Sequence, residues 1–193
     1  MLTIPNLLTF LRLLLIPIFV VVYFLEWQWA HQFAAFLFWF AAVTDWFDGY
    51  LARKLRQVTP FGAFLDPVAD KLIVAAALLL ITHRYNSIWI TVPAIILLMR
   101  EVYVSALREW MAMRGHSAQV KVSIWGKAKT MAQMLAIIGL LSELEYLPVS
   151  HDLVIPLYWQ TLGYGLLYVA TALSVFSMYQ YTIAAKPLLA GRQ

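Results

Sequence analysis

The chain has 193 residues, of which 63% are hydrophobic and only 12% are charged. This apolar share excludes an ordinary soluble domain and indicates a polytopic helical membrane protein. The net charge of +4 could suggest nucleic acid, but the basic residues follow the predicted loops, so membrane lipids with anionic headgroups are the expected partners instead. The absence of cysteine excludes disulfides and thiolate metal sites.

Six apolar stretches predict six transmembrane helices, each near the ~20 residues that a spanning helix needs. In chain order they cover residues 6–25, 33–52, 63–82, 88–107, 124–142 and 154–181, approximately. No repeat or soluble linker interrupts them. We therefore expect an all-α membrane protein with one domain over residues 1–193, in which six transmembrane helices surround a polar cavity that faces the cytoplasm.

Lysine and arginine are distributed unevenly between the connections, and the side richer in them is expected to face the cytoplasm. The connections after the second and fourth helices and the C-terminal tail are the basic ones, with Arg53, Lys54, Arg56, Arg108, Arg114, Lys121, Lys127, Lys129, Lys186 and Arg192. The opposite connections hold only Arg84. Both termini are therefore expected in the cytoplasm.

Four aspartates lie inside the second and third apolar stretches, where each carboxylate costs about 2.5–3.5 kcal/mol on insertion scales. Asp45 and Asp48 are spaced i, i+3, and Asp66 and Asp70 are spaced i, i+4, so each pair shares one helix face. A short connection makes the two helices antiparallel neighbours and brings all four carboxylates near one membrane surface. Hard oxygen ligands suit Mg²⁺, Mn²⁺ or Ca²⁺, and two such ions could clamp a pyrophosphate.

Intramembrane aspartates also occur in proteins that carry out no phosphate chemistry. A lone aspartate can serve helix pairing or a proton or ion path, and a cation transporter would use carboxylates as its ion site. Transporters often show internal repeats and sites at the midplane, whereas this chain shows no repeat and its acids lie toward one surface. A structural subunit without chemistry leaves the acidic pattern unexplained.

The frame D-x2-D-G-x2-A-R-x8-G-x3-D-x3-D over residues 45–70 resembles, at every fixed position, the signature of the CDP-alcohol phosphotransferase family. The resemblance implies transfer of a phosphatidyl or similar group from a CDP-linked donor to an alcohol, with release of CMP. It implies that two divalent ions, Mg²⁺ or Mn²⁺, are held by Asp45, Asp48, Asp66 and Asp70, that Asp70 is also the general base, and that the protein is a homodimer.

The same resemblance implies a donor pocket lined by Gly49, Ala52, Arg53 and Gly62. The first helix adds a polar stripe of Asn6, Thr9 and Arg12 at i, i+3 and i+6, which is expected to border the donor or acceptor. We assign Asn6 and Thr9 to the donor and Arg12 to the acceptor. The stripe could equally serve helix pairing.

The pattern of cations indicates an anionic acceptor, because arginine and lysine beside the acidic site could hold a phosphate dianion. The candidates for this role are Arg12, Arg100, Arg108, Lys127 and Lys129. The positive-inside bias explains part of this charge but explains Arg100 poorly, since Arg100 lies well inside its span. Arg100 could instead pair with Glu101 or an aspartate, and Lys71 is expected to face away from Asp70 as a snorkelling or helix-pairing charge.

Several segments, including IPNLLTFLRLLLIP near the N-terminus, FGAFLDPVADK and GKAKT, resemble the bacterial branch of the family whose acceptor is sn-glycerol 3-phosphate. This resemblance implies that CDP-diacylglycerol and glycerol 3-phosphate give phosphatidylglycerol phosphate and CMP at a bacterial cytoplasmic membrane. The alternatives within the family are enzymes of the cardiolipin synthase and phosphatidylinositol phosphate synthase types.

Overall fold

A computed structural model of the protein describes residues 4–55, 60–114, 124–142, 146–148, 154–156 and 159–189. These residues form helices α1 (Ile4–Tyr23), α2 (Ala30–Leu55), α3 (Pro60–Tyr85), α4 (Ile88–Met113), α5 (Ile124–Ser142) and α6 (Trp159–Leu189). Two short strands, β1 (Tyr146–Pro148) and β2 (Val154–Pro156), pair antiparallel between α5 and α6. The prediction of six helices is confirmed.

The helix bounds differ from the apolar stretches mainly at their ends. Helix α5 begins and ends where the sequence predicts, while α2 and α3 extend by several residues beyond their apolar segments. The predicted sixth helix was wrong at its start, because residues 154–156 form β2 and α6 begins at Trp159. Pro156 therefore lies in a strand, whereas Pro17 and Pro93 lie inside helices α1 and α4.

Three helical stretches in the described part of the chain are long and apolar enough to cross a membrane: Asn6–Tyr23, Ile88–Met113 and Trp159–Lys186. The apolar stretches of α2 and α5 within that part are shorter. In α3, two aspartates and Lys71 interrupt the first half of the helix. Many large apolar side chains point outward, including Leu14, Leu79 and Met99, as expected where lipid rather than water surrounds the helices.

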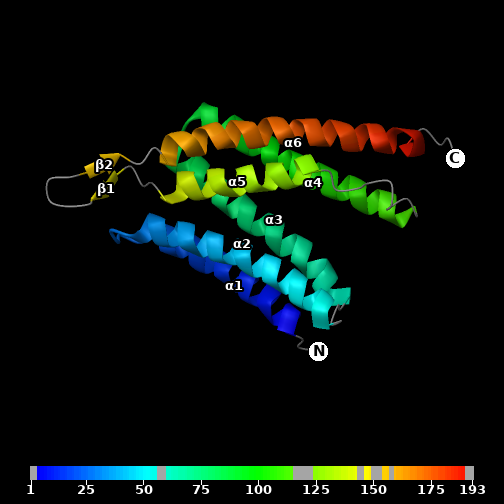
Figure 1. Cartoon of the computed structure of the whole chain (residues 1–193), viewed down its shortest axis with the longest axis horizontal. Helices are drawn as coiled ribbons and strands as arrows, with labels where there is room; N and C mark the ends of the chain where they lie inside the picture. Colours follow the sequence, from blue (N-terminus) through cyan, green and yellow to red (C-terminus); the bar gives the residue numbers. More distant parts are fainter. Residues whose placement is uncertain are drawn as a thin grey trace.

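The helices pack as two pairs joined by α3 and α4. Helix α1 lies beside α2, and α5 lies beside α6, while α3 also contacts α1 and α4 also contacts α6 (Figure 1). The start of α1 and the end of α6 lie toward the same side of the molecule, and the β1–β2 hairpin lies on the opposite side (Figure 1). This arrangement agrees with a chain whose two ends lie on one side of the membrane.

A continuous apolar core joins the helices away from the aspartates. Phe19 of α1 and Phe38 of α2 are fully buried with ring centroids 6.4 Å apart, and Ile81 of α3 and Leu167 of α6 belong to the same cluster. Near the hairpin, the Tyr85 hydroxyl donates to the carbonyl oxygen of Leu140 at 3.2 Å and accepts from Gln160 Nε2 at 2.8 Å. These bonds tie α3 to α5 and α6 at this end.

Helices α5 and α6 approach closely because glycines line their contact. A Cβ atom added at Gly163 would lie 3.2 Å from the backbone nitrogen of Leu140 and 3.3 Å from the carbonyl oxygen of Ala136. A Cβ atom added at Gly165 would meet nothing within 4 Å. Small residues that let two backbones approach are the usual device of helix packing in membranes. The chain therefore uses Gly163, but not Gly165, for this packing.

We predict that Gly163→Ala lowers the free energy of unfolding by about 1–3 kcal/mol, because the backbone atoms of α5 cannot easily make room for the added methyl group. The matched substitution Gly165→Ala should change it by no more than about 0.5 kcal/mol. Thermal unfolding of both purified variants in the same detergent measures the difference. Equal midpoints for the two variants would contradict the close α5–α6 contact.

Candidate active site

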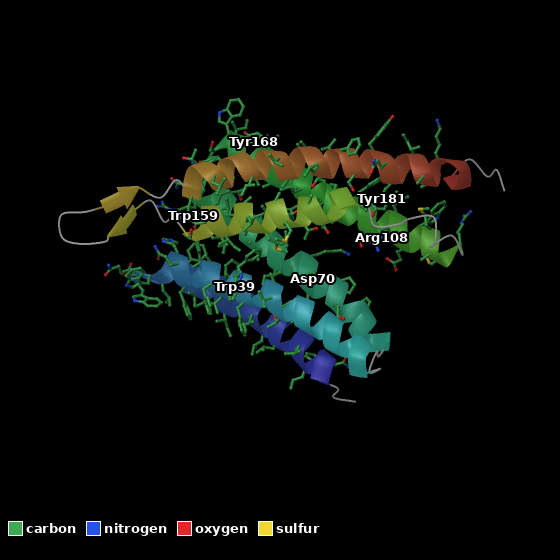
Figure 2. All side chains as sticks on the ribbon, in the orientation of Figure 1. Trp39, Asp70, Arg108, Trp159, Tyr168 and Tyr181 are labelled. Carbon is green, nitrogen blue, oxygen red and sulfur yellow. The ribbon has the colours of Figure 1, made fainter. Side chains whose placement is uncertain are left out.

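A cavity of about 700 Å³ lies between α3 and α4, with Tyr181 of α6 on its wall. Its polar lining includes Asp66, Asp70 and Lys71 from α3 and Arg100, Glu101, Ser105, Arg108 and Glu109 from α4. Figure 2 shows Asp70 near the middle of the molecule, between the α1–α2 pair and the α5–α6 pair, with Arg108 and Tyr181 on the neighbouring parts of α4 and α6. A polar cavity is therefore present, and its described lining comes from α3, α4 and α6 rather than from all six helices.

The two α3 carboxylates are one helical turn apart, and both line this cavity. Each also accepts a hydrogen bond from α1. Thr9 Oγ1 donates to Asp66 Oδ1 at 2.5 Å, and Arg12 Nη1 donates to Asp70 Oδ1 at 2.5 Å. The Arg12 side chain is 1% exposed, whereas that of Asp70 is 44% exposed. Arg12 thus orients Asp70 from a buried position outside the cavity lining, while the carboxyl group of Asp70 stays accessible from the cavity.

The polar stripe of α1 serves these carboxylates directly. Asn6, Thr9 and Arg12 are all buried, and two of them contact α3 aspartates. The sequence predicts the stripe beside the site but cannot show these contacts, which join residues 57 and 58 positions apart. They depend on the packing of α1 against α3. The sequence leaves helix pairing and proximity to the site open as alternatives. In the structure the stripe does both, because its contacts join α1 to α3 at the two aspartates.

The other predicted donor and metal residues lie on α2 and at the start of α3. Helix α2 carries Asp45, Asp48, Gly49, Ala52 and Arg53, whose side chains lie outside what the structure describes. Gly62 is a buried residue of α3. Helix α2 contacts both α1 and α3, so its backbone belongs to the same part of the bundle as Asp66 and Asp70.

Metal binding can be assessed from the two described aspartates. Among the described residues, no group of three or more potential metal-ligating side chains is present. Asp66 and Asp70 nevertheless supply two carboxylates on one helix face that borders an open cavity. Hard oxygen donors of this kind fit Mg²⁺ or Mn²⁺, with further ligands required from a neighbouring helix such as α2.

Glu101 is the centre of a second polar cluster on the wall of the cavity. Its Oε2 atom accepts from Arg100 Nη1 at 3.1 Å and from Lys129 Nζ at 3.0 Å. Arg100 Nη2 also donates to Ser177 Oγ at 3.0 Å. Because Arg100 and Lys129 are buried, this cluster ties α4, α5 and α6 together inside the protein. The pairing of Arg100 with Glu101, one of the two roles that the sequence allows for Arg100, is confirmed.

A smaller cavity of about 170 Å³ connects the two polar clusters. It is lined by Arg12 and Asp70 from the first cluster and by Glu101, Gln133 and Thr130 near the second. Glu101 and Asp70 border both this cavity and the larger one. Of the paired charges, Asp70, Arg100 and Glu101 line the larger cavity, whereas Arg12 and Lys129 are not part of its lining.

Lys71 lies where the sequence did not predict. It was expected to face away from Asp70, but both residues line the large cavity. Its Nζ atom donates to Ser105 Oγ of α4, so it does join two helices, as a helix-pairing charge would. Arg108, one turn from Ser105, is exposed on the same wall. Lys127 lies on α5, with its side chain outside the described part of the chain.

Comparison with known proteins identifies the family. Residues 2–180 match the CDP-alcohol phosphatidyltransferase family. The chain belongs to this family. The matched region contains every candidate site residue named above, from Asn6 on α1 to Lys129 on α5, together with Ser177 of α6. The family relationship thus covers both polar clusters and not only the acidic frame on α2 and α3.

Individual members of the CDP-alcohol phosphatidyltransferase family resemble the chain over nearly its whole length. It is 49% identical over 187 residues to a CDP-diacylglycerol–glycerol-3-phosphate 3-phosphatidyltransferase of Pseudomonas fluorescens, covering 96% of this chain and 91% of the relative. Proteins of the same name from Pectobacterium atrosepticum and Salmonella paratyphi A are also 49% identical, each covering 95% of this chain and 94% of the relative.

We predict that Glu101 and Lys129 are energetically coupled in this family member, because each neutralises the other at a poorly solvated position. A double-mutant cycle of Glu101→Gln and Lys129→Met should give a coupling free energy of about 0.5–3 kcal/mol. The free energies of unfolding are measured by denaturant titration in mixed micelles.

The control cycle replaces Glu101→Gln by Glu109→Gln, since Glu109 is exposed on the same helix. Its coupling to Lys129→Met should not exceed about 0.5 kcal/mol. A coupling of similar size in both cycles would show that general charge balance, rather than the observed ion pair, accounts for the effect.

Proposed function

We propose that the chain transfers the phosphatidyl group of CDP-diacylglycerol to sn-glycerol 3-phosphate, giving phosphatidylglycerol phosphate and CMP. Near-full-length relatives at 49% identity carry the name of this activity. The structural observation that carries the proposal is a cavity lined by Asp66 and Asp70 together with the basic residues Lys71 and Arg108. Carboxylates suit metal and proton chemistry, while cations suit a phosphate-bearing acceptor.

The acidic side of the cavity is the proposed reaction centre. Asp45, Asp48, Asp66 and Asp70 would hold two divalent ions, Mg²⁺ or Mn²⁺. When bound, such ions polarise phosphoryl oxygens and offset the negative charge of the leaving nucleotide. The chain's own contribution is to carry the carboxylates on neighbouring helices and to hold Asp66 and Asp70 in position by hydrogen bonds from Thr9 and Arg12.

Asp70 is the proposed general base. The acceptor hydroxyl must lose its proton as its oxygen attacks phosphorus, so a carboxylate within hydrogen-bond reach is needed. Asp70 is supported for this role because it is partly exposed in the cavity and is oriented by buried Arg12. The proton passes from the acceptor hydroxyl to the Asp70 carboxylate as the new phosphorus–oxygen bond forms and the bond to CMP breaks.

The two substrates would occupy different parts of the site. Gly49, Ala52, Arg53, Gly62, Asn6 and Thr9 are proposed to line the position of the CDP group. Arg108 is proposed to contact the acceptor phosphate, because it is exposed on the cavity wall. Arg12, Arg100, Lys127 and Lys129 remain candidates whose positive charge favours an anion nearby. For Arg100 and Lys129 this contribution is reduced by their ion pairs with Glu101.

The proposed location is a bacterial cytoplasmic membrane, which the chain crosses several times as one domain. Glycerol 3-phosphate is water-soluble, so the cavity has to open to the cytoplasm. The uneven distribution of lysine and arginine supports cytoplasmic termini on the same side. The proposed partners are CDP-diacylglycerol, glycerol 3-phosphate and membrane lipids. A homodimer is proposed on family likeness.

We predict that the purified protein, supplied with CDP-diacylglycerol and Mg²⁺, releases CMP when glycerol 3-phosphate is added. Asp70→Asn should lower kcat by at least about 10²-fold, because it removes both a proton acceptor and a proposed metal ligand. Glu26→Gln, which changes an exposed carboxylate outside the cavity lining, is the control and should retain most of the activity. The measurement follows radiolabelled acceptor into lipid and CMP into solution.

A panel of acceptors in the same assay tests the alternatives. Transfer to phosphatidylglycerol would indicate a cardiolipin synthase, and transfer to inositol phosphate would indicate the corresponding synthase. Absence of CMP release with every acceptor, together with cation flux in proteoliposomes, would instead support the transporter. Wild-type turnover by folded Asp70→Asn protein would remove Asp70 from the role of base.

A further inference from the structure

We propose that Lys71 is the residue that makes this site select a phosphate-bearing acceptor, acting with Arg108 across the cavity between α3 and α4. This inference rests on the proposed function and assigns acceptor selectivity to a residue outside the acidic frame. The charge, the position and the chemistry of Lys71 each support it.

The cations near the cavity differ in whether a carboxylate neutralises them. Arg12 is paired with Asp70, and Arg100 and Lys129 share Glu101. Lys71 differs, because its one hydrogen-bond partner within the described part of the chain is the neutral hydroxyl of Ser105. Arg108 has no ion pair with a described carboxylate and is exposed. The positive charges available to a ligand at this wall are therefore those of Lys71 and Arg108.

The position of Lys71 is set by its contact with α4. Ser105 and Arg108 are spaced i, i+3 on α4, so the hydroxyl that holds Lys71 and the Arg108 guanidinium lie on one helix face. The contact with Ser105 fixes the ammonium group without neutralising it. An ammonium has three N–H donors, so two remain for a ligand after the bond to Ser105. The half-buried Lys71 side chain is also less solvated than a surface lysine.

The chemistry of the proposed acceptor matches these two cations. Glycerol 3-phosphate carries a dianionic phosphate at one end and a primary hydroxyl at the other. Lys71 directly follows Asp70 on α3, and both line the same cavity. A phosphate held by the Lys71 ammonium and the Arg108 guanidinium would leave the hydroxyl end for Asp70. Arginine contributes a planar fork and lysine a point charge, and both form strong charge-assisted bonds with phosphate.

The experiment compares Lys71→Met with wild-type protein in the CMP-release assay. Methionine keeps most of the length of the side chain but removes the charge. The KM for glycerol 3-phosphate should rise by about 10- to 100-fold, the range expected for a hydrogen bond between charged groups. The KM for CDP-diacylglycerol should stay within about twofold, because a residue that binds only one substrate affects only that substrate. Lys71→Arg should restore part of the acceptor affinity.

Neutral glycerol as acceptor separates binding from a structural effect. We expect the wild-type protein to use glycerol with a much lower kcat/KM than glycerol 3-phosphate. Loss of a phosphate contact should lower kcat/KM for glycerol 3-phosphate and leave kcat/KM for glycerol unchanged, so selectivity between the two falls. A merely structural role would lower both together. The matched control is Lys186→Met, which removes the charge of an exposed lysine of α6 outside the cavity lining and should change neither constant.

Ser105→Ala is the second variant, and it tests the role of Lys71 in acceptor binding if Lys71→Met elutes as an aggregate in size-exclusion chromatography. It releases the ammonium from its fixed position and should raise the KM for glycerol 3-phosphate alone. An unchanged acceptor KM in the folded variants would overturn the inference while leaving the proposed function intact. Failure of the wild-type protein to use glycerol 3-phosphate at all would instead remove the proposed function.

Discussion

The structure depends on partners that compensate the charge of carboxylates within lipid-embedded helices. One such group costs about 2.5–3.5 kcal/mol on insertion scales, so several in one place require partners. Helix α1 supplies two of these partners, since Thr9 donates to Asp66 and Arg12 donates to Asp70. The divalent ions that we propose would compensate the same pair together with Asp45 and Asp48. This requirement explains why the first helix, although highly apolar, carries a buried polar stripe.

The same requirement divides the cations into two kinds. Arg12, Arg100 and Lys129 are buried and paired with carboxylates, so they hold helices together and position Asp70 and Glu101. Lys71 and Arg108 lie on the wall of the open cavity without a carboxylate partner among the described residues. Positive charge is thus kept for a ligand on the side of α3 and α4 that faces the cavity. A site with this division suits an acceptor that carries its own negative charge.

Much of the fold and of the site could be predicted from the sequence. Local patterns predict helices and helix faces, but they do not predict contacts between residues that are far apart in the chain. Apolar length predicts six helices, and the spacing of the aspartates within α3 places Asp66 and Asp70 on one face. The β1–β2 hairpin was not predicted, because its second strand, Val154–Pro156, is apolar and was assigned to the start of the sixth helix. The Arg12–Asp70 pair joins residues 58 positions apart, and Lys71 contacts Ser105 only through the packing of α4 on α3. Such contacts depend on tertiary structure, which local patterns do not record.

The central claim, that these carboxylates form a site for divalent ions, is tested most directly by Mn²⁺ binding to purified protein, measured by electron paramagnetic resonance. We expect the spectrum of a magnetically coupled pair of Mn²⁺ ions, because the two ions of such sites lie about 3.5–4 Å apart. Asp66→Asn combined with Asp70→Asn should abolish this signal in folded protein. Absence of bound Mn²⁺ in the wild-type protein, or an unchanged signal in the double variant, would contradict the claim.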